Sequence, residues 1–202
     1  MSIYKTDAAS YNIAVENLDY NDICDSLAGD QKAFERLVIR YQPRIIRLMW
    51  RFSRDRQTCE RLVQDVFVEA YFSLKTYKAK APFEHWLSRI ASRVGYRHFK
   101  EQDKEKQTLP LPDFDIAAAD SQQQQADPEK AAELLYWLLA KLPATDRLAL
   151  TLVYLEDCSI KDVADKTGWT TPAVKMRLSR ARKKLKEIAE KEKISERFEW
   201  TL

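Results

Sequence analysis

The chain has 202 residues, of which 45% are apolar and 32% charged, and it carries a net charge of +3. This balance is typical of a folded protein and argues against a disordered chain. Only three glycines are present, and because hairpins and barrel corners usually need glycine, the composition also disfavours an all-β fold.

The cysteines and histidines give no sign of a metal centre. Cys24, Cys59 and Cys158 are far apart and form no Cys-x-x-Cys pair, and the two histidines are His85 and His98. These spacings predict neither a metal site nor a disulfide framework, and we expect no cofactor. Reduced thiols, the absence of a signal-peptide pattern and the lack of roughly 18 consecutive apolar residues predict a cytoplasmic protein without membrane insertion.

The N-terminal part of the chain begins without a helical pattern. Residues 1–20 show no clear periodicity and are predicted to form a flexible arm. Apolar residues then recur with three-and-four spacing, which predicts a long helix from Asn21. Pro43 lies inside this pattern and predicts a break or kink near Gln42, because proline lacks a backbone donor and clashes with the preceding turn.

Two more helices complete a first helical domain over residues 21–102. The segment Cys59–Tyr77 is amphipathic, and Thr58 is its predicted N-cap. The segment Phe83–Lys100 follows a short basic loop. Its apolar residues recur on one side and predict an inner face made of Trp86, Leu87, Ile90, Ala91 and Val94.

The composition then changes abruptly. Residues 107–129 contain five acidic residues, three prolines and no Lys or Arg. Such a segment buries too little apolar area to offset the entropy of ordering it, which predicts a flexible acidic linker over residues 103–128. A second helical domain over 129–192 and a tail over 193–202 follow. The fold class is therefore predicted to be all-α, with two small helical domains and a linker between them.

The second domain carries a helix-turn-helix pattern. Ser159 and Asp162 are spaced as a capping box, and Gly168 suits a turn that needs a positive φ angle. Thr171 is the predicted cap of the next helix, and Pro172 suits its first position. This layout is typical of DNA-binding proteins whose second helix enters the major groove.

The second helix of this motif is strongly basic. Residues 175–186 hold seven basic side chains and no acidic one. Such clustering favours phosphate binding with release of counterions. Lys175 and Arg180 lie near the helix start and are placed to contact guanine edges, whereas Arg182 and later residues suit backbone phosphates. The alternative is a solvated basic face on a surface helix.

A second basic helix lies in the first domain. Arg89, Arg93 and Arg97 repeat every four residues with aromatic residues between them, and Trp86 to Lys100 contains no acidic residue. Basic and aromatic side chains together suit single-stranded nucleic acid, whose bases stack on rings. The residues alone leave open a plainer alternative, in which Trp86 belongs to the core and the arginines are merely solvated.

Several segments resemble extracytoplasmic-function sigma factors, the small promoter-recognition subunits of bacterial RNA polymerase. The first pair is LVQDVFVEAY at residues 62–71 and APFEHWLSRIA at 81–91. The second pair is Leu142-Pro143 and TPAVKMRLSRAR at residues 171–182. Both pairs occur in the family order, and the resemblance covers residues 21–192 apart from the linker.

The resemblance implies three sets of binding residues. Those expected to bind core polymerase are Leu62, Gln64, Asp65, Phe67 and Glu69. The loop Lys78–Pro82 with Phe83 would capture a base flipped from the minus-ten element, and the arginines would hold the adjoining strand. The expected minus-ten residues are Lys78, Lys80, Phe83, Trp86, Arg89, Arg93 and Arg97. Those expected to bind the minus-thirty-five element are Thr171, Lys175, Met176, Ser179, Arg180, Arg182 and Lys183.

The function implied is that of a promoter-specificity subunit rather than an enzyme. It would bind core RNA polymerase and promoter DNA, help melt the promoter and start transcription of a stress- or signal-responsive set of genes. An anti-sigma factor is an expected partner. The acidic linker would thread through polymerase channels as a phosphate mimic, although solubilising an ordinary linker explains its acids equally well.

Two departures from the family pattern stand out. Arg61 replaces the usual acid three residues before Gln64, which reverses a charge near the polymerase contact, and Pro172-Ala173 replaces the usual Gly-Thr. Two other functions compete with a sigma factor. A dimeric regulator explains the helix-turn-helix but not the basic-aromatic helix. A nucleic-acid enzyme lacks any recognisable metal cluster, phosphate-binding glycine loop or nucleophile–base spacing.

Overall fold

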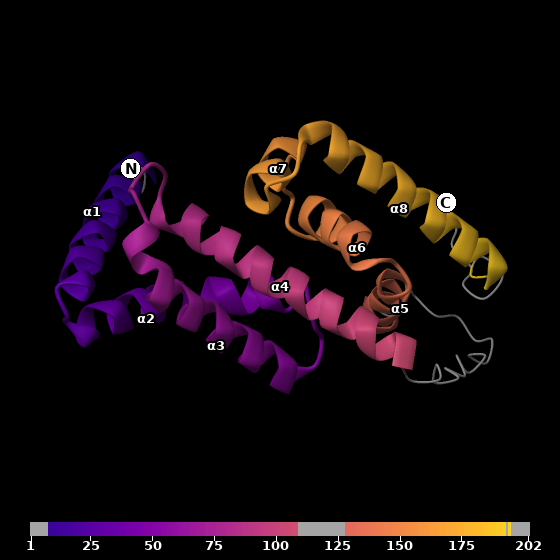
Figure 1. The fold of residues 1–202 in the computed structure, drawn as a ribbon, viewed down its shortest axis with the longest axis horizontal. Coiled ribbons are helices and arrows are strands. Elements are labelled where there is room, and N and C mark those ends of the chain that lie inside the picture. The colour runs from indigo at the N-terminus through magenta and orange to yellow at the C-terminus, as the bar shows by residue number, and fades with distance from the viewer. Residues whose placement is uncertain (1–7, 109–127, 193, 195–202) are drawn as a thin grey trace, which may run out of the picture. The chain divides into compact units, whose positions relative to one another are not determined.

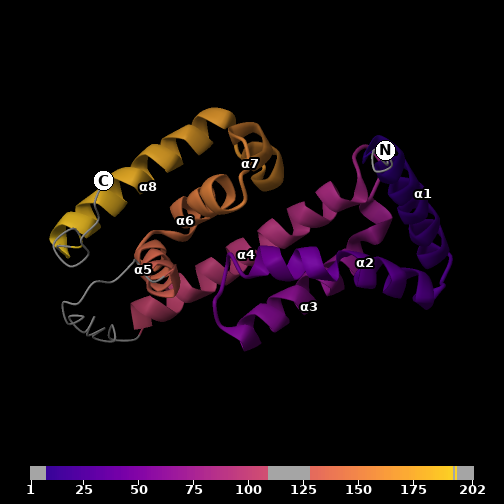
Figure 2. The same cartoon turned by 180° about the vertical axis from the view of Figure 1, so that it is seen from behind.

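The computed structural model describes residues 8–108, 128–192 and 194, and all the regular structure in these residues is helical (Figures 1 and 2). This confirms the predicted all-α class. The chain divides into two compact units between Gly95 and Tyr96. The division falls inside one long helix, α4 (Phe83–Thr108), so each unit contains part of it.

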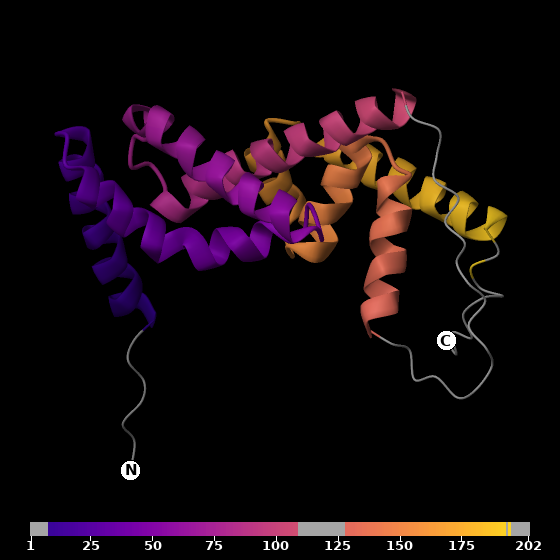
Figure 3. The same cartoon turned by 90° about the horizontal axis from the view of Figure 1, so that it is seen from below.

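The first unit contains α1 (Ala8–Leu27), α2 (Gln31–Met49), α3 (Arg56–Ser73), the short 3-10 helix η1 (Leu74–Thr76) and the first part of α4 (Figure 3). The helices from α2 onward each bury one apolar face, as their spacing predicts. The largest fully buried side chains of this core are Leu37, Ile45, Met49, Phe52, Leu62, Val66, Leu87 and Ile90. Every predicted inner residue of α4 is buried except Trp86, which is half-buried.

A close backbone approach fixes where α4 lies in this core. Gly95 lies in α4, and a Cβ added to it would lie 2.2–2.6 Å from three carbons of the Phe52 ring. The Phe52 side chain is itself fully buried. Only glycine leaves room for the ring at this distance, since interiors are packed at nearly crystalline density.

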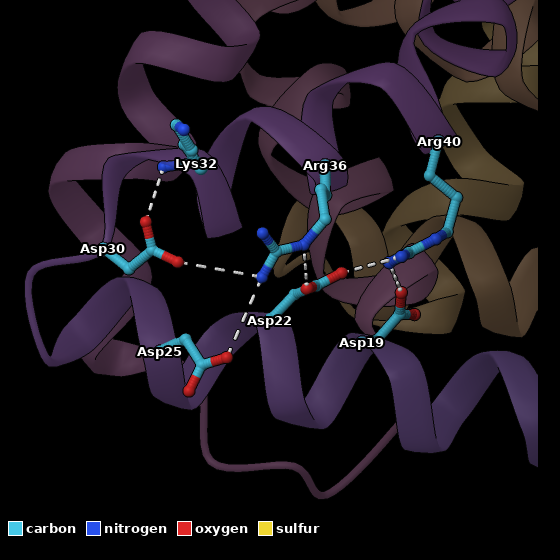
Figure 4. Close-up of polar contacts among 7 residues, drawn as sticks. All are labelled: Asp19, Asp22, Asp25, Asp30, Lys32, Arg36 and Arg40. Atoms are coloured by element: carbon cyan, nitrogen blue, oxygen red, sulfur yellow. Dashed lines mark hydrogen bonds and ion pairs between the residues drawn. The ribbon is translucent and has the colours of Figure 1, made fainter.

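The predicted flexible arm over residues 1–20 is wrong from Ala8 onward, because α1 begins there. The helix has no marked apolar stripe, which is why periodicity missed it. Charged pairs dock it on α2 instead (Figure 4). Arg40 donates from Nη1 to Asp19 at 2.5 Å and from Nη2 to Asp22 at 2.7 Å. Arg36 Nε donates to Asp22 at 2.7 Å.

Two aspartates at the centre of this cluster are buried and respond to it in opposite ways. Asp19 also accepts a short hydrogen bond from the Tyr41 hydroxyl. Burial raises the pKa of Asp19 above its usual value, against the lowering effect of Tyr41 and Arg40. Burial also raises the pKa of Asp22, but the hydrogen bonds from Arg40 and Arg36 outweigh it and the net pKa is lowered. Asp22 is therefore held as a carboxylate.

Other details of the predicted helices also need correction. Helix α2 runs without a break through Pro43, and the chain turns instead at Gly29, whose φ angle is +105°. Thr58 is not the N-cap of α3. Asp55 is the cap, and its carboxylate accepts from the Thr58 backbone amide at 2.7 Å. Aspartate is an equally good cap, and helical spacing alone does not place a helix end.

The second unit contains the rest of α4, α5 (Pro128–Ala140), α6 (Ala144–Leu150), the π-helical segment η2 (Thr151–Leu155), α7 (Ile160–Thr167) and α8 (Thr171–Lys191). Six of the seven residues of α6 are buried, which makes it the centre of this unit. Arg147 is one of them. Its guanidinium lies 3.9 Å from the centre of the Phe99 ring and donates to Gln102 at 2.8 Å, and burial lowers its pKa to about 10.

The predicted linker begins too early. Helix α4 continues to Thr108, and the Asp103 carboxylate caps α6 by accepting from the Ala144 amide at 2.8 Å. The rest of the predicted linker up to 127 lies outside the described residues, as does the predicted tail except for residue 194. Among the residues that the structure does describe, no helix is long and apolar enough to cross a membrane, and no group of three potential metal ligands occurs.

Gly95→Ala should destabilise the chain by about 1–3 kcal/mol, because the new methyl group overlaps the Phe52 ring. Urea unfolding followed by circular dichroism measures this free energy. Phe52→Leu in the same background makes room for the methyl group, so the double variant should lose less stability than the sum of the two single losses. Simple additivity would show that the two residues do not crowd each other.

Asp22→Asn should destabilise the chain by about 1–3 kcal/mol at pH 7, because two arginines lose a charged acceptor. Since the pKa of Asp22 is lowered in the folded chain, this stability is present above the usual pKa of 3.8 and is lost as pH falls through the folded pKa. Urea unfolding at pH 7 and pH 3 should therefore show that the difference in free energy of unfolding between variant and wild type is smaller at pH 3. Asp25→Asn, at an exposed aspartate 3.8 Å from Arg36, is the matched control and should change little; an equal loss in both variants would contradict the assignment.

Candidate nucleic-acid interface

Helices α7 and α8 form the predicted helix-turn-helix. The capping box is confirmed: the Asp162 amide donates to the Ser159 hydroxyl at 3.1 Å, and the Ser159 amide donates to the Asp162 carboxylate at 3.0 Å. Gly168 ends α7 with a φ angle of +76°, as expected. This turn directs the chain from α7 into α8, the helix that would face DNA.

The start of α8 differs from the prediction by one residue. Thr170, and not Thr171, is the N-cap, and its hydroxyl accepts from the Ala173 amide at 3.3 Å. Thr171 is the first residue of the helix, so Pro172 occupies the second position rather than the first. Proline is tolerated at either position, because the first amides of a helix have no intrahelical acceptor.

Helix α8 has a buried apolar side and an exposed basic side. Val174, Leu178 and Ala181 are buried as predicted, and Leu185 is half-buried. All the residues expected to bind the minus-thirty-five element are exposed, namely Thr171, Lys175, Met176, Ser179, Arg180, Arg182 and Lys183. The structure therefore places this whole set on one accessible helix.

The cations on α8 are not equivalent. The Arg180 guanidinium is bound by the Asp146 carboxylate, which raises the pKa of Arg180 through hydrogen bonding. Arg182 donates from Nε to the Leu178 carbonyl at 3.3 Å. Arg177 lies 4.3 Å from the centre of the Trp169 ring, a cation–π contact that holds the turn against α8. Lys175 is exposed and, across the described ranges, has no carboxylate at ion-pair distance.

The basic loop of the first unit is held in a defined shape. The Tyr77 hydroxyl donates to the Ala81 carbonyl at 2.7 Å, and Ala79 takes a left-handed conformation with φ of +52°. A non-glycine residue rarely adopts this conformation, and such strain often accompanies binding sites. Lys78 and Lys80 are both exposed on the loop.

The aromatic residues beside the loop form a cluster in which Phe83 is central. Its ring centre lies 5.4–5.5 Å from those of Tyr41, Tyr77 and Trp86, and its side chain is 2% exposed. Trp86 is half-buried. Phe83 therefore supports the loop from inside and offers no free face to a base, whereas Trp86 retains accessible surface.

The arginines of α4 are exposed at Arg89, Arg93 and Arg97, one turn apart. Arg93 Nη2 lies 2.9 Å from Oε1 of Glu69 on α3. The sequence assigned Arg93 to the minus-ten set and Glu69 to the polymerase set, so the structure brings one member of each into contact. Arg89 and Arg93 are thus in different electrostatic surroundings.

The α3 residues expected to bind polymerase split into two groups. Leu62 and Phe67 are buried in the core. Gln64 is exposed, and Asp65 and Glu69 are half-exposed. Arg61 Nη1 lies 3.6 Å from Oδ2 of Asp65, one helical turn away, so its reversed charge is partly offset locally. A shallow hollow beside Gln64 is lined by Gln57, Thr58, Glu60 and Arg61.

Some residues of these surfaces had no sequence signal. Asp146 binds Arg180 from another helix, and Tyr77 binds the carbonyl of Ala81 across the loop. Neither contact follows a spacing rule that could be read from the sequence. Val68 and Phe72 on α3 are 55% and 74% exposed. Exposed apolar residues at three-and-four spacing on a helix were detectable in principle, because they fall outside its buried face.

Comparison with known proteins gives these surfaces a family. Residues 37–105 match the family model described as Sigma-70 region 2, and residues 132–185 match Sigma-70, region 4. The RNA polymerase sigma-H factor of Pseudomonas aeruginosa is 30% identical over 168 residues, which span 76% of this chain and 84% of the relative. The ECF RNA polymerase sigma-E factor of Escherichia coli K12 is 28% identical over 166 residues, 76% of this chain and 85% of the relative.

Solved structures share the fold. CnrH in complex with the cytosolic domain of CnrY has a TM-score of 0.54 at 23% identity, over 86% of this chain and 97% of that one. The sigma factor RpoE from Bartonella quintana, in complex with the anti-sigma factor NepR, has a TM-score of 0.52 at 22% identity, over 79% and 98%. At these identities the likeness concerns the fold.

An all-helical chain with sigma-70 region 2 followed by region 4 defines a promoter-recognition subunit of bacterial RNA polymerase. This chain belongs to the extracytoplasmic-function sigma factors of that family. Sigma factors are transcription initiation factors that bind core polymerase and promoter DNA. The family assignment favours this function over a dimeric regulator or a nucleic-acid enzyme.

Thr170→Ala should destabilise the second unit by about 1 kcal/mol, because it removes the N-cap of α8. Thr171→Ala is the matched control one residue away and should change stability by a few tenths of a kcal/mol at most, since alanine is a good helix former. Thermal unfolding of the full chain, followed by tryptophan fluorescence, distinguishes the two. A larger loss for Thr171→Ala would restore Thr171 as the cap.

Proposed function

We propose that α8 binds the minus-thirty-five element of promoters as duplex DNA. The observation that carries this proposal is the exposed basic side of α8 in a helix-turn-helix inside the region 4 match. Lys175 and Ser179 lie one turn apart and are both exposed, in the half of the helix that would enter the major groove. Lys183 lies a further turn along and suits a phosphate.

The loop and α4 of the first unit would bind the minus-ten element as a melted strand. Lys78 and Lys80 attract phosphates at the loop, and the accessible part of Trp86 offers a stacking surface for a base. Phe83 serves this site by supporting the loop from the core. Arg89 then holds the strand along α4, whereas Arg93 is shared with Glu69; Arg97 lies on the part of α4 that belongs to the second unit.

The exposed side of α3 would bind core polymerase. Gln64 and Asp65 supply polar contacts, and the neighbouring Val68 and Phe72 supply apolar area that a partner groove would bury. Leu62 and Phe67 contribute by packing α3 on the core. The Arg61–Asp65 pair sets the local charge of this surface.

In the cell the chain would act in the cytoplasm as a non-enzymatic subunit that redirects polymerase to a signal-responsive set of genes. An anti-sigma factor would hold it inactive, by analogy with the complex of the sigma factor RpoE with the anti-sigma factor NepR. Release of that partner would free the DNA-binding and polymerase-binding surfaces together.

Transcription by bacterial core polymerase on a library of genomic fragments tests the proposal. Sequencing of the RNA 5′ ends should reveal start sites that appear only with this chain and share two upstream elements. Lys175→Glu should lower these transcripts roughly tenfold or more, because it replaces a phosphate- or base-contacting cation with a repelling charge. Lys161→Glu, at an exposed lysine of α7, is the matched control and should leave them nearly unchanged.

A second variant separates the two DNA surfaces. Arg89→Glu should leave binding to closed duplex promoters intact and reduce the permanganate reactivity of melted thymines at the minus-ten element. The absence of both core binding and new start sites would overturn the proposal. A stable homodimer that binds a palindrome without polymerase would instead indicate a conventional regulator.

A further inference from the structure

Asp146 is a buried carboxylate beneath the proposed DNA-binding helix. It is the third residue of α6, and its side chain is 1% exposed. A carboxylate in the first turn of a helix is favoured by the helix dipole, but burial at this level requires a charged partner as well. That partner is Arg180 on α8: Nε donates to Oδ2 at 2.8 Å and Nη2 donates to Oδ1 at 2.5 Å.

Arg180 reaches this carboxylate from the surface. Its side chain is 52% exposed, and Met176, Ser179 and Lys183 beside it on α8 are also exposed. The two hydrogen bonds use Nε and Nη2, along one edge of the planar guanidinium. The donors of Nη1 therefore remain for a ligand, and the paired edge fixes the plane in which they lie.

The pair is expected to persist when DNA binds. Drawing Arg180 away would leave the Asp146 charge buried without a partner, which is among the most unfavourable changes a protein interior undergoes. A phosphate or a base edge would give Arg180 no stronger hydrogen bonds than Asp146 already gives it, because the Asp146 carboxylate is shielded from water. Arg180 can thus meet DNA as a fixed donor without leaving its carboxylate.

We propose that Asp146 is a positioning residue for DNA binding: it fixes the Arg180 guanidinium on the exposed side of α8 and cancels its charge. Arg180 then contributes directed hydrogen bonds, whereas Lys175 contributes charge that displaces counterions. This inference rests on the proposed role of α8 as the DNA-binding helix. It deepens that role by dividing the basic side of α8 into charge-carrying and orienting residues.

The salt dependence of DNA binding tests this division. The full-length chain is titrated with a fluorescein-labelled duplex of mixed sequence at KCl concentrations from about 50 to 200 mM, and the logarithm of affinity is plotted against that of salt. Lys175→Ala should lower the magnitude of the slope by about 0.9, because one phosphate contact disappears. Arg180→Gln alone would leave the Asp146 charge unpaired, so the test of charge cancellation has to neutralise Asp146 as well.

The reverse substitution gives the diagnostic result. Asp146→Asn preserves the shape of the side chain and frees the Arg180 charge, so the slope should steepen by up to about 0.9. The double variant Asp146→Asn/Arg180→Gln should return to the wild-type slope. A purely structural pair would alter thermal stability in these variants without this pattern of slopes, and circular dichroism confirms folding before each titration.

The possible outcomes are distinguishable. A slope change in Asp146→Asn/Arg180→Gln as large as that in Lys175→Ala, or no steepening in Asp146→Asn, would overturn the inference and leave the DNA-binding role of α8 standing. An unchanged slope in both Lys175→Ala and Asp146→Asn would remove α8 from DNA binding, and the proposed function would fail with it. If Asp146→Asn does not fold, the double variant Asp146→Asn/Arg180→Gln, which buries no unpaired charge, still decides the question against Lys175→Ala.

Discussion

Within the first unit, helix α4 exposes Arg89 and Arg93 on successive turns because its opposite side is buried. Leu87, Ile90, Ala91 and Val94 are each at most 1% exposed. The burial of this side fixes the rotation of the helix about its axis, and with it the direction of Arg89 and Arg93. Gly95 lets the helix approach Phe52 closely enough for that burial. The charged surface of the first unit is in this sense a product of its apolar core.

Helical spacing and turn chemistry predicted most of the fold. The all-α class, the capping box at Ser159 and the left-handed Gly168 are confirmed, because each depends on residues close together in sequence. The errors have a common origin. Helix α1 is held on α2 by ion pairs rather than by an apolar stripe. The starts of α3 and α8 depend on which of two polar residues, at most three positions apart, accepts a backbone amide.

The candidate site divides in the same way. The pattern of basic residues predicted the exposed sides of α4 and α8, but it could not show which of these basic residues are paired with an acidic residue. Arg93 with Glu69, and Arg180 with Asp146, are contacts between helices that are distant in sequence. Phe83 shows the converse problem: an aromatic residue beside a loop has the same pattern whether it faces a base or, as here, the core. Only the packing separates these cases.

The bond between the Tyr77 hydroxyl and the Ala81 carbonyl has a consequence for engineering. A loop closed by its own side chain keeps its conformation only while both ends of that contact stay the same number of residues apart. Exchanging this segment with that of another sigma factor, in order to redirect promoter choice, would succeed structurally only with grafts that preserve the spacing and supply a hydroxyl at the first position. The scaffold thus accepts changes of side chain in this loop more readily than changes of length.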